Sequence, residues 1–354
     1  MQILIVGAGL AGTTLAYELN KKGASISLLD DAIENSSSKV AAGVIKPITG
    51  KRAVKTWNAD KLIPEAHSFY NAIQERTGLS FFGSTPLLQL FSSEGNRNDW
   101  MGRTIDTKDA HYFSEVVSTN QMPTYIKSSF GGIYLNSCFK LNTRLFLSAI
   151  INLLKNDIHS ITEKFKWDKL IVKKDHIFYG KIKFDKIIFC EGSKVIENEY
   201  FNSIPFAPLK GELIKVQFER TIKQEIISSG IYIIPEYEKI AIVGATYDWA
   251  DTASAPTSQK RSELVNKLEH IMNLNCRILE QKAAFRPTIQ DRRPVVGFHP
   301  EFSSIGILNG LGTKGVLLVP YCATQFSDMI MNNIQLDPEI DVKRFSALLE
   351  HQGS

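Results

Sequence analysis

A glycine-rich hexapeptide near the start of the chain has the spacing of a nucleotide-binding turn. Its residues are Gly7, Ala8, Gly9, Leu10, Ala11 and Gly12. In such a turn the first glycine permits a tight bend, the second lets the backbone approach a pyrophosphate, and the third lets the following helix pack closely. The N–H groups at the start of that helix bind phosphate oxygens, so the hexapeptide predicts a dinucleotide site.

Two acidic residues follow the hexapeptide at a distance that suits the ribose of a dinucleotide. Asp30 lies 18 residues after Gly12 and directly before Asp31, at the end of an apolar run. A carboxylate at this place accepts hydrogen bonds from ribose hydroxyls and disfavours the extra phosphate of NADP. We assign both aspartates to the cofactor site, which leaves FAD and NAD open.

Small residues after the acidic pair favour FAD over NAD. They are Ser36, Ser37 and Ser38, followed by Ala41, Ala42 and Gly43. Small side chains let a loop run along a bulky cofactor, and the hydroxyl of Ser38 is suited to bind a phosphate oxygen. A nicotinamide dehydrogenase usually continues with another βα unit at this place. The alternative interpretation of the segment is a flexible serine-rich linker.

A second glycine-rich cluster, residues 309–315, precedes a helical run and predicts a second anion-binding helix start. Reduction places negative charge on N1 and C2=O of a flavin ring, and a helix start that faces these atoms would stabilise the charge. The residues expected at the cofactor are Gly312, Thr313, Lys314 and Gly315. Lys314 would add its own positive charge. An ordinary loop with a solvated lysine is the alternative.

Arg286 is suited to bind a substrate carboxylate. An arginine clamps a carboxylate through two parallel hydrogen bonds, which fixes the position of the rest of the substrate. The alternative is a structural ion pair with a nearby acid such as Asp291. The 7 histidines show no metal-ligand spacing and the 4 cysteines form no Cys-x-x-Cys pair, so we expect no metal site.

The composition is that of a globular protein. Of 354 residues, 44% are hydrophobic and 22% are charged, and the length suggests two domains. A formal net charge of +4 suits an anionic substrate but is too small to indicate nucleic acid by itself. No apolar stretch is long enough to span a membrane, and the apolar run 3–6 lacks the features of a signal peptide, so we expect a cytoplasmic protein.

Hydrophobic periodicity places these residues on alternating α/β and β-rich segments. A strand at 2–6, a helix between Gly9 and Gly23 and a strand at 25–29 form a βαβ opening. Further helices are expected around 62–73, after Asn142, at about 258–272 and from about Val316. Further strands are expected at 187–190, 213–218, 231–234, 240–245 and 294–297, with an antiparallel region at 79–135 and a β-meander at 164–186. Residues 35–59 are expected to form a long functional loop. The alternation indicates two domains made of discontinuous segments.

Taken together, these residues resemble the FAD-dependent D-amino-acid oxidase superfamily, in particular its glycine oxidase and sarcosine oxidase branch. The resemblance runs through five ordered blocks, which are residues 7–12, 41–43, 189–192, 208–212, and 231–235 leading to 244–246. It closes with Arg286, Asp291, Gly297 and the cluster 310–315. In the third block, Gly192 belongs to a turn that reads Ala-Ser/Thr-Gly in the family, so Gly192 is also assigned to the cofactor site.

The resemblance implies an α/β fold in which a Rossmann-like FAD-binding domain is interleaved with an α+β substrate-binding domain. The antiparallel sheet of the second domain would roof the flavin. We expect the FAD-binding domain to comprise residues 1–78, 136–207 and 286–354. We expect the substrate-binding domain to comprise residues 79–135 and 208–285.

The resemblance also implies roles for individual residues. In glycine-oxidase-like members, the arginine that matches Arg286 binds the substrate carboxylate, and a second basic residue of that site falls near Thr313. In sarcosine oxidases a cysteine holds the flavin covalently, and its place falls near Ala284 in this chain. We therefore expect FAD to be bound without a covalent bond.

The end of the chain resembles a further branch. Residues 310–315 are similar to the Leu-Gly-Ser-Arg-Gly signature of the FAD domain in the bifunctional enzyme that makes the methylaminomethyl group of wobble 2-thiouridine in tRNA. The pattern of residues 286–297 matches the same domain, which removes a carboxymethyl group from a secondary amine. The methyltransferase half of that enzyme is expected to be missing, because the chain starts at the glycine hexapeptide.

The main hypothesis is an FAD-dependent amine oxidase or dehydrogenase that acts on a small amino acid or secondary amine. A hydride passes to flavin N5, the imine is hydrolysed, and oxygen or another acceptor reoxidises the flavin. Arg286 would orient the substrate and Lys314 would stabilise charge. The candidate wall residues are Tyr232 and Trp249, and the alternative for both is core or surface packing, which is the preferred interpretation for Trp249. The first alternative is oxidation of a carboxymethylaminomethyl side chain on tRNA, which the basic segment 35–59 would support, although a solvated face beside the FAD phosphates is the preferred interpretation of that segment. The others are a flavoprotein that only binds a ligand or senses redox state, and an NAD-dependent dehydrogenase.

Overall fold

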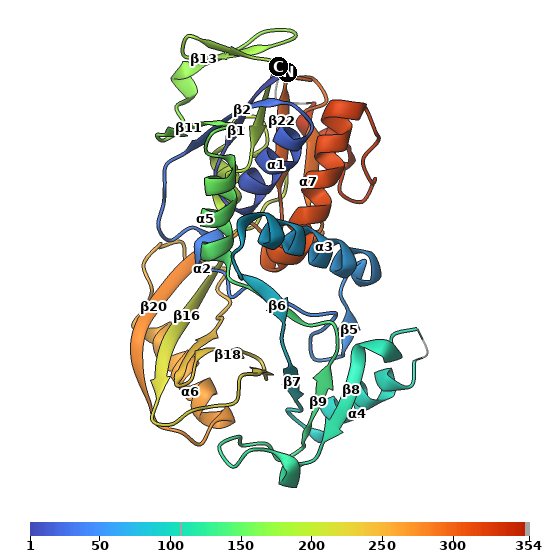
Figure 1. Cartoon of the computed structure of the whole chain (residues 1–354), viewed down its shortest axis with the longest axis vertical. Coiled ribbons are helices and arrows are strands. Elements are labelled where there is room, and N and C mark those ends of the chain that lie inside the picture. The colour runs from blue at the N-terminus through green and yellow to red at the C-terminus, as the bar shows by residue number, and fades with distance from the viewer. Residues whose placement is uncertain (107, 351–354) are drawn as a thin grey trace.

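The computed structural model describes residues 1–106 and 108–350, and two large β-sheets organise it. The strands of the first sheet are β1 (Gln2–Val6), β2 (Ser25–Asp30), β11 (His159–Thr162), β15 (Lys186–Phe189), β21 (Val295–Phe298) and β22 (Ile305–Asn309). Their order is β11-β2-β1-β15-β22-β21, and all neighbours run parallel except β21 and β22. In Figure 1 this sheet lies in the upper half of the molecule and the second sheet lies in the lower half.

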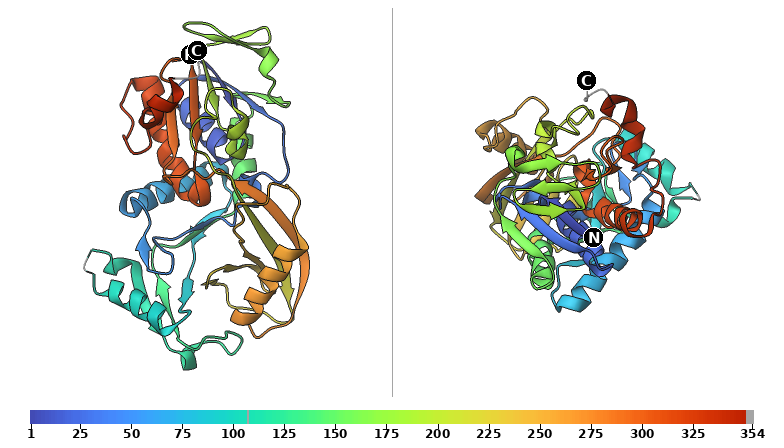
Figure 2. Two further views of the ribbon diagram at one scale, coloured as in Figure 1. Left: turned by 180° about the vertical axis from the view of Figure 1, so that it is seen from behind. Right: turned by 90° about the horizontal axis from the view of Figure 1, so that it is seen from above.

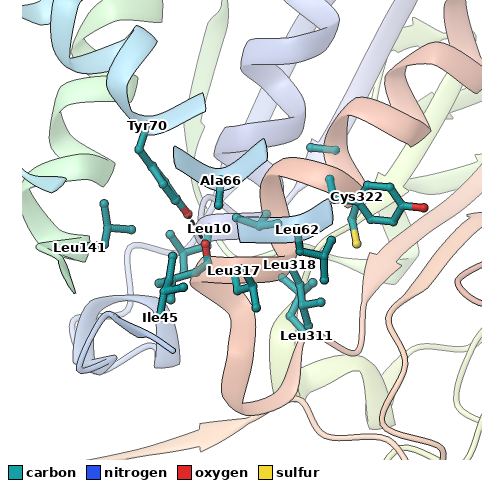
Figure 3. Packing of buried hydrophobic residues seen from close by; sticks show 14 of the residues in the cluster. Leu10, Ile45, Leu62, Ala66, Tyr70, Leu141, Leu311, Leu317, Leu318 and Cys322 are labelled. Carbon is teal, nitrogen blue, oxygen red and sulfur yellow. Dashed lines mark hydrogen bonds between the residues drawn. The ribbon is translucent and has the colours of Figure 1, made fainter. Parts of the chain in front are cut away.

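Helices cover one face of the first sheet, because the segments between its strands each bury an apolar side. They are α1 (Leu10–Lys21), α3 (Ala59–Thr77), α5 (Thr143–Leu154) and α7 (Gly315–Asn332). α1 packs against α5 and α7, and α3 packs against α7. Figure 3 shows the last contact, where Leu62 and Tyr70 of α3 lie over Leu317 of α7. The Tyr70 hydroxyl donates a 2.7 Å hydrogen bond to the carbonyl of Val316, which holds the start of α7 in place.

A β-meander covers the opposite face of the first sheet. It consists of β12 (Leu170–Val172), β13 (Ile177–Tyr179) and β14 (Ile182–Phe184), within the residues predicted to form one. Its aromatic side chains pack on β15, where Phe165 stacks on Tyr179 with ring centroids 5.1 Å apart and meets Phe189 edge-on at 5.4 Å. Figure 2 shows the meander at the end of the molecule that is farthest from the second sheet.

The second sheet has eight strands and is mostly antiparallel. They are β7 (Leu87–Leu90), β8 (Phe113–Val117), β9 (Gly132–Leu135), β16 (Leu209–Phe218), β17 (Ile226–Ser228), β18 (Tyr232–Tyr237), β19 (Ile240–Gly244) and β20 (Cys276–Arg286). The order is β20-β16-β19-β18-β17-β7-β9-β8, and β17 runs parallel to β7. The helix α6 (Ser258–Ile271) buries Leu264 and Leu268 against this sheet. The side chain of Thr257 caps α6 by accepting a hydrogen bond from the N–H of Lys260.

The expected substrate-binding segments, 79–135 and 208–285, contain nearly all residues of the eight-stranded sheet. The division into domains stays a prediction. One strand of segment 79–135 does not join the eight-stranded sheet but pairs with strands of the segments expected in the other domain. β6 (Phe82–Ser84) pairs with β10 (Phe139–Leu141), which also pairs with β3 (Val44–Ile45). This three-stranded sheet joins the segments expected in different domains.

Parts of the secondary structure differ from the sequence-based expectation. The segment 35–59, expected as a loop, contains α2 (Ser37–Val40), β3 and the hairpin of β4 (Ile48–Thr49) and β5 (Val54–Lys55). Residues 79–135 include the polar helix α4 (Glu94–Thr104), in which Trp100 alone among the described residues is buried, so no apolar period marks it. The remaining elements are α8 (Ser346–Leu349) and the 3₁₀ turns η1 (Ala110–Tyr112), η2 (Thr119–Gln121), η3 (Trp167–Lys169), η4 (Gly192–Glu197), η5 (Gly312–Lys314) and η6 (Val342–Phe345). None of the helices in residues 1–106 and 108–350 is long and apolar enough to cross a membrane.

Candidate active site

A large cavity of about 1780 Å³ opens where the two sheets meet. Its lining comes from the carboxyl ends of β15 and β22 and the start of α1 on one side, and from β16, β18, β19 and β20 on the other. Ligands of open α/β sheets bind at this carboxyl edge. A site for one drug-sized ligand measures roughly 300–1,000 Å³. The cavity therefore has room for a dinucleotide and a substrate together.

The glycine hexapeptide forms the turn between β1 and α1. Gly7 has a φ of +103°, and a Cβ atom on it would lie 2.5 Å from the carbonyl oxygen of Cys190. A Cβ atom on Gly12 would lie 1.8 Å from the carbonyl oxygen of Gly7, so glycine is required for α1 to approach the turn. Gly7 and Gly12 thus shape the turn from behind. The hexapeptide residues that line the cavity are Gly9, Leu10 and Ala11.

Asp30 stabilises the glycine turn in this structure. Its Oδ1 accepts a 2.8 Å hydrogen bond from the N–H of Ala8, and its Oδ2 accepts one of 2.8 Å from the N–H of Ala32. Asp31 instead forms an ion pair with Lys194, with Oδ2 and Nζ 2.5 Å apart. Neither aspartate is among the described residues that line the cavity. Their contact with a ribose therefore stays a prediction.

The small residues after β2 follow the cavity wall. Ser38 lies on the N-terminus of α1, where its Oγ accepts a 2.9 Å hydrogen bond from the N–H of Leu10. Residues 41–43 continue the lining. A Cβ atom on Gly43, whose φ is +72°, would lie 1.9 Å from the carbonyl oxygen of Leu141 on β10. This close packing and the short helix α2 make the segment part of the fold, so the alternative of a flexible linker is wrong.

The second glycine-rich cluster reaches the same cavity from the carboxyl end of β22. Asn309 donates a 3.0 Å hydrogen bond from Nδ2 to the carbonyl of Gly192, which ties the ends of β22 and β15 together. The predicted cofactor residues that line the cavity here are Gly192, Gly312, Thr313, Lys314 and Gly315. The first and second glycine clusters thus meet at one edge of the sheet, although they lie about 300 positions apart in sequence.

Lys314 is partly withdrawn from solvent and points to a neighbouring hydroxyl. Its Nζ donates a 3.2 Å hydrogen bond to Oγ1 of Thr56. Burial, with Arg293 and Arg292 nearby, lowers the pKa of Lys314 to about 8. These contacts argue against an ordinary solvated lysine, and the role of Lys314 at the cofactor stays a prediction.

Arg286 ends β20 and lines the cavity without a carboxylate partner among the described residues. Its guanidinium lies over Gly211 of β16, where a Cβ atom would come within 2.4 Å of the guanidinium carbon. The group donates a 3.3 Å hydrogen bond to the carbonyl of Thr246 and lies over the ring of Tyr247, 4.8 Å from its centroid. Burial lowers the pKa of Arg286.

The alternative role for Arg286, an ion pair with Asp291, is wrong. Asp291 accepts a 2.9 Å hydrogen bond from Nε of Arg344, which also donates to the carbonyls of Arg293 and Pro294. Arg344 therefore holds the loop before β21 together. Arg286 remains available to bind an anion that enters the cavity.

Lys46 is a site residue that the sequence analysis does not single out, because it is one of several basic residues in segment 35–59. Its side chain is buried and lines the cavity. Nζ donates hydrogen bonds to Oε1 of Gln89 (3.3 Å) and Oγ of Ser228 (3.2 Å). It also lies 5.1 Å from the ring centroid of Tyr232, the predicted wall residue. The available signal was the position of this lysine between the apolar residues Ile45 and Ile48, both of which are buried.

The charge of the lining is basic throughout. The charged side chains among the described lining residues are Lys46, Lys51, Arg52, Lys55, Arg286, Arg292, Arg293 and Lys314, and none is acidic. Lys55 is paired with Asp60 and Asp109, and Arg293 is paired with Glu339. Trp249 lies at the rim and is 63% exposed. Such a cavity attracts anions. No group of three metal-ligating side chains occurs in the described part of the chain.

Comparison with known proteins also supports an FAD-dependent enzyme. A family model described as FAD dependent oxidoreductase, of the DAO family, matches residues 2–329. A tRNA 5-methylaminomethyl-2-thiouridine biosynthesis bifunctional protein from Marinobacter nauticus is 24% identical over 363 aligned residues, which cover 93% of this chain and 55% of that protein. The chain spans about half the length of the curated relatives that it matches.

Solved structures share the whole fold. The glycine oxidase from Bacillus cereus superposes with a TM-score of 0.80 at 16% identity, over 94% of this chain and 96% of that chain. The iminodiacetate oxidase from Chelativorans sp. superposes with a TM-score of 0.78 at 19% identity, over 97% of this chain and 98% of that chain. These likenesses confirm the predicted α/β fold class.

Proposed function

Because this chain belongs to the DAO family of FAD-dependent oxidoreductases, we propose that it oxidises the C–N bond of a small amine that carries a carboxylate. The observation that carries the proposal is Arg286, whose guanidinium faces the cavity and has no carboxylate partner among the described residues. A planar guanidinium binds a carboxylate through two parallel hydrogen bonds. The bound carboxylate would fix the adjacent C–H and amine in one orientation.

The residues of the cavity fit FAD. The N-terminus of α1 and the narrow turn at Gly7 and Gly12 suit a pyrophosphate, and the described lining has no carboxylate to repel it. Gly9, Leu10, Ala11 and Ser38 would hold the phosphates, and residues 41–43 and 312–315 would contact the rest of the cofactor. When bound, FAD supplies the acceptor for the hydride that leaves the substrate carbon.

The chain itself supplies orientation and charge. Arg286 would hold the substrate carboxylate, and Tyr232 would form the wall against which the substrate lies. Lys314 would place a positive charge near the second glycine cluster, where a reduced flavin needs it. Hydride transfer requires this geometry more than it requires a strong acid or base. The imine product would then be hydrolysed, and turnover would need an electron acceptor, oxygen or another oxidant.

An anaerobic screen tests this function. The yellow holoprotein is mixed with glycine, N-methylglycine and iminodiacetate, and with methylamine and dimethylamine as matched amines that lack a carboxylate. We expect the flavin absorbance band to bleach with at least one carboxylate-bearing amine and to persist with its partner. Equal bleaching by both members of a pair would contradict the role of a carboxylate site, and bleaching by no amine would contradict amine oxidation.

The second candidate substrate is a carboxymethylaminomethyl group on tRNA. Its amine also carries a carboxylate, so Arg286 would bind it in the same way. The observation that favours it is that the exposed residues lining the cavity include the basic side chains of Lys51, Arg52 and Arg292 and the indole of Trp249. Basic side chains bind phosphates, and an exposed aromatic ring stacks on bases. Bleaching by tRNA that carries this group, but not by the isolated modified nucleoside, would support this candidate.

FAD is expected to bind without a covalent bond. Cys190 lines the cavity, but burial raises the pKa of its thiol, so the reactive thiolate is suppressed. The position matched to the attachment cysteine of sarcosine oxidases is near Ala284. Acid precipitation of the yellow protein should therefore leave the colour in the supernatant. Colour that remains in the pellet would show covalent attachment.

Asp30→Ala is expected to weaken FAD binding by about 1–3 kcal/mol, because the turn loses the carboxylate that holds Ala8 and the ribose loses an acceptor. The measurement is the FAD dissociation constant, from quenching of flavin fluorescence on titration with apoprotein. Asp185→Ala is the matched control, since Asp185 accepts a 2.7 Å hydrogen bond from the N–H of Gln2 at the opposite end of β1. Equal affinities of the two variants would contradict a special role for Asp30.

A further inference from the structure

This inference rests on the proposed function: a substrate amine that enters the cavity as the ammonium ion must lose a proton there before it can be oxidised. An amine gives up a hydride from the adjacent carbon only when its nitrogen has a free electron pair, whereas most amines are ammonium ions at neutral pH. Among the described lining residues there is no aspartate, glutamate or histidine to accept this proton. Burial raises the pKa of the Tyr232 hydroxyl, which makes it no acceptor near neutral pH. Among the described lining residues, Lys46 and Lys314 are the lysines whose pKa burial lowers.

The hydrogen bonds around Lys46 leave one position on its Nζ atom at which a neutral lysine can accept a proton. Ser228 donates its hydroxyl proton to Oε1 of Gln89 at 2.9 Å, so both atoms act as acceptors toward the lysine. Gln89 is held in this orientation because its Nε2 donates a 2.9 Å hydrogen bond to the carbonyl of Leu90. A neutral amine has two N–H groups for these two acceptors and one electron pair left to take a proton.

The charged and titratable groups that face Lys46 come from three other elements. The ring of Tyr232 on β18 weakly attracts a cation. Cys138, between β9 and β10, has a pKa that burial raises to about 12, so its thiol is neutral. Lys314 of η5 opposes a second positive charge. Burial is the largest effect, Lys314 acts in the same direction, and the pKa of Lys46 is lowered to about 8, so the group exchanges its proton near neutral pH.

Lys46 and Lys314 are close enough to affect each other, but their side chains have different neighbours. Lys46 lies against Tyr232, the wall expected at the substrate, whereas Lys314 belongs to the glycine cluster expected at the cofactor. A proton acceptor is useful beside the substrate, where Lys46 is expected, and a cation is useful beside the cofactor, where Lys314 is expected.

We propose that Lys46 is a catalytic residue that accepts the proton of the substrate's ammonium group. One N–H bond of the ammonium ion breaks, the proton forms a new bond to Nζ of Lys46, and the electron pair of the broken bond stays on the substrate nitrogen. The substrate becomes the neutral amine, and Lys46 becomes an ammonium group. Lys46 returns its proton to water after the product leaves.

The first test follows the pH dependence of anaerobic flavin bleaching by the carboxylate-bearing amine that reacts fastest in the screen. Below about pH 8 Lys46 is protonated, so the second-order rate constant of the wild type should fall tenfold for each unit of decreasing pH. Lys46→Met and Lys46→Arg should both lose this inflection and react about 10²–10⁴-fold more slowly at pH 7. Both variants should recover towards high pH, where the amine enters without its proton.

Two control variants accompany this test, and two results would contradict the proposal. Lys140→Met removes a half-buried lysine outside the cavity, whose Nζ donates to the carbonyl of Pro235, and should keep the wild-type profile. Lys314→Met should keep the inflection but move it upward, because a neighbouring cation is removed. Wild-type behaviour of Lys46→Arg would overturn the proposal and show that Lys46 acts only as a fixed charge. An unchanged inflection in Lys46→Met would overturn it as well.

The second test needs no substrate. The holoprotein is produced with ¹³C,¹⁵N-labelled lysine, and the Lys46 side-chain NMR signal is assigned by its loss in Lys46→Arg. Its chemical shift should titrate with a midpoint near pH 8. A midpoint at the ordinary lysine value of about 10.5 would overturn the proposal even if the amine screen succeeds. A midpoint near 8 with no bleaching by any amine would contradict the proposed function and leave Lys46 without an amine to deprotonate, which also overturns its role.

Discussion

Arg286→Lys is expected to lower kcat/KM for a carboxylate-bearing amine by about 30- to 5,000-fold, which corresponds to about 2–5 kcal/mol. Lysine keeps the positive charge but loses the planar pair of donors that fixes a carboxylate. KM should rise because binding weakens, and kcat should fall to the extent that the C–H bond is misplaced. FAD content should stay normal, because the described partners of Arg286 are Thr246 and Tyr247, and neither is among the residues assigned to the cofactor. A variant that loses FAD or fails to fold would indicate a structural role instead.

A matched pair of glycine variants separates the position of Arg286 from its charge. Gly211→Ala leaves the arginine in place but puts a Cβ atom where the guanidinium now lies. The end of a flexible side chain gives way more easily than the backbone, so the protein should fold with a displaced guanidinium and a raised KM. Gly83→Ala on β6 adds a Cβ atom in open space and should change neither constant. A normal KM in Gly211→Ala would contradict the assignment of the carboxylate to Arg286.

Lys314→Met is expected to lower the two-electron reduction potential of the bound flavin by about 60–90 mV, which corresponds to a 10²–10³-fold loss in the stability of the reduced form. The lysine lies beside the second glycine cluster, where the account places the negative charge of reduction. The potential is measured against a reference dye during slow anaerobic reduction. Lys314→Arg should retain most of the wild-type potential, because it keeps the charge.

The same experiment, repeated at several pH values, shows how the reduction potential of the flavin depends on pH. Burial lowers the pKa of Lys314 to about 8, so this lysine loses its charge, and with it the stabilisation of the reduced flavin, as the pH rises through that value. The potential of the wild type should therefore fall more steeply with pH in this range than that of Lys314→Met. Identical potentials in the wild type and Lys314→Met would place the lysine away from the charged part of the flavin.

The cofactor half of the site is readable from the sequence because its signals are local. The bend at Gly7 and the close approach at Gly12 are properties of consecutive residues, and they require glycine whatever surrounds them. The strand β1 and the helix α1 also follow from apolar periodicity over a short window. The helix expected after Asn142 is α5, and Asn142 caps it, since its side chain accepts a 3.1 Å hydrogen bond from the N–H of Leu145.

The substrate half depends on contacts that no local pattern records. The partner of Asp291 is Arg344, 53 positions away, and nothing near Arg286 in sequence shows that its guanidinium is unpaired. The strand β20 (Cys276–Arg286) has no regular alternation of charged and apolar residues, and it is ordered by pairing along its length with β16, which lies more than 50 positions earlier in the sequence. Lys46 becomes a site residue only because Gln89, Ser228 and Tyr232 arrive from three other strands.

The central claim, that the flavin oxidises the C–N bond of a carboxylate-bearing amine, is tested most directly by a single anaerobic turnover. The holoprotein is mixed with the reactive amine of the screen, either unlabelled or deuterated at the carbon between nitrogen and carboxylate. We expect one equivalent of carbonyl product and one of released amine for each flavin bleached, and several-fold slower bleaching with the deuterated compound. Bleaching without a carbonyl product, or bleaching by NADH or NADPH and by none of the amines, would contradict the account.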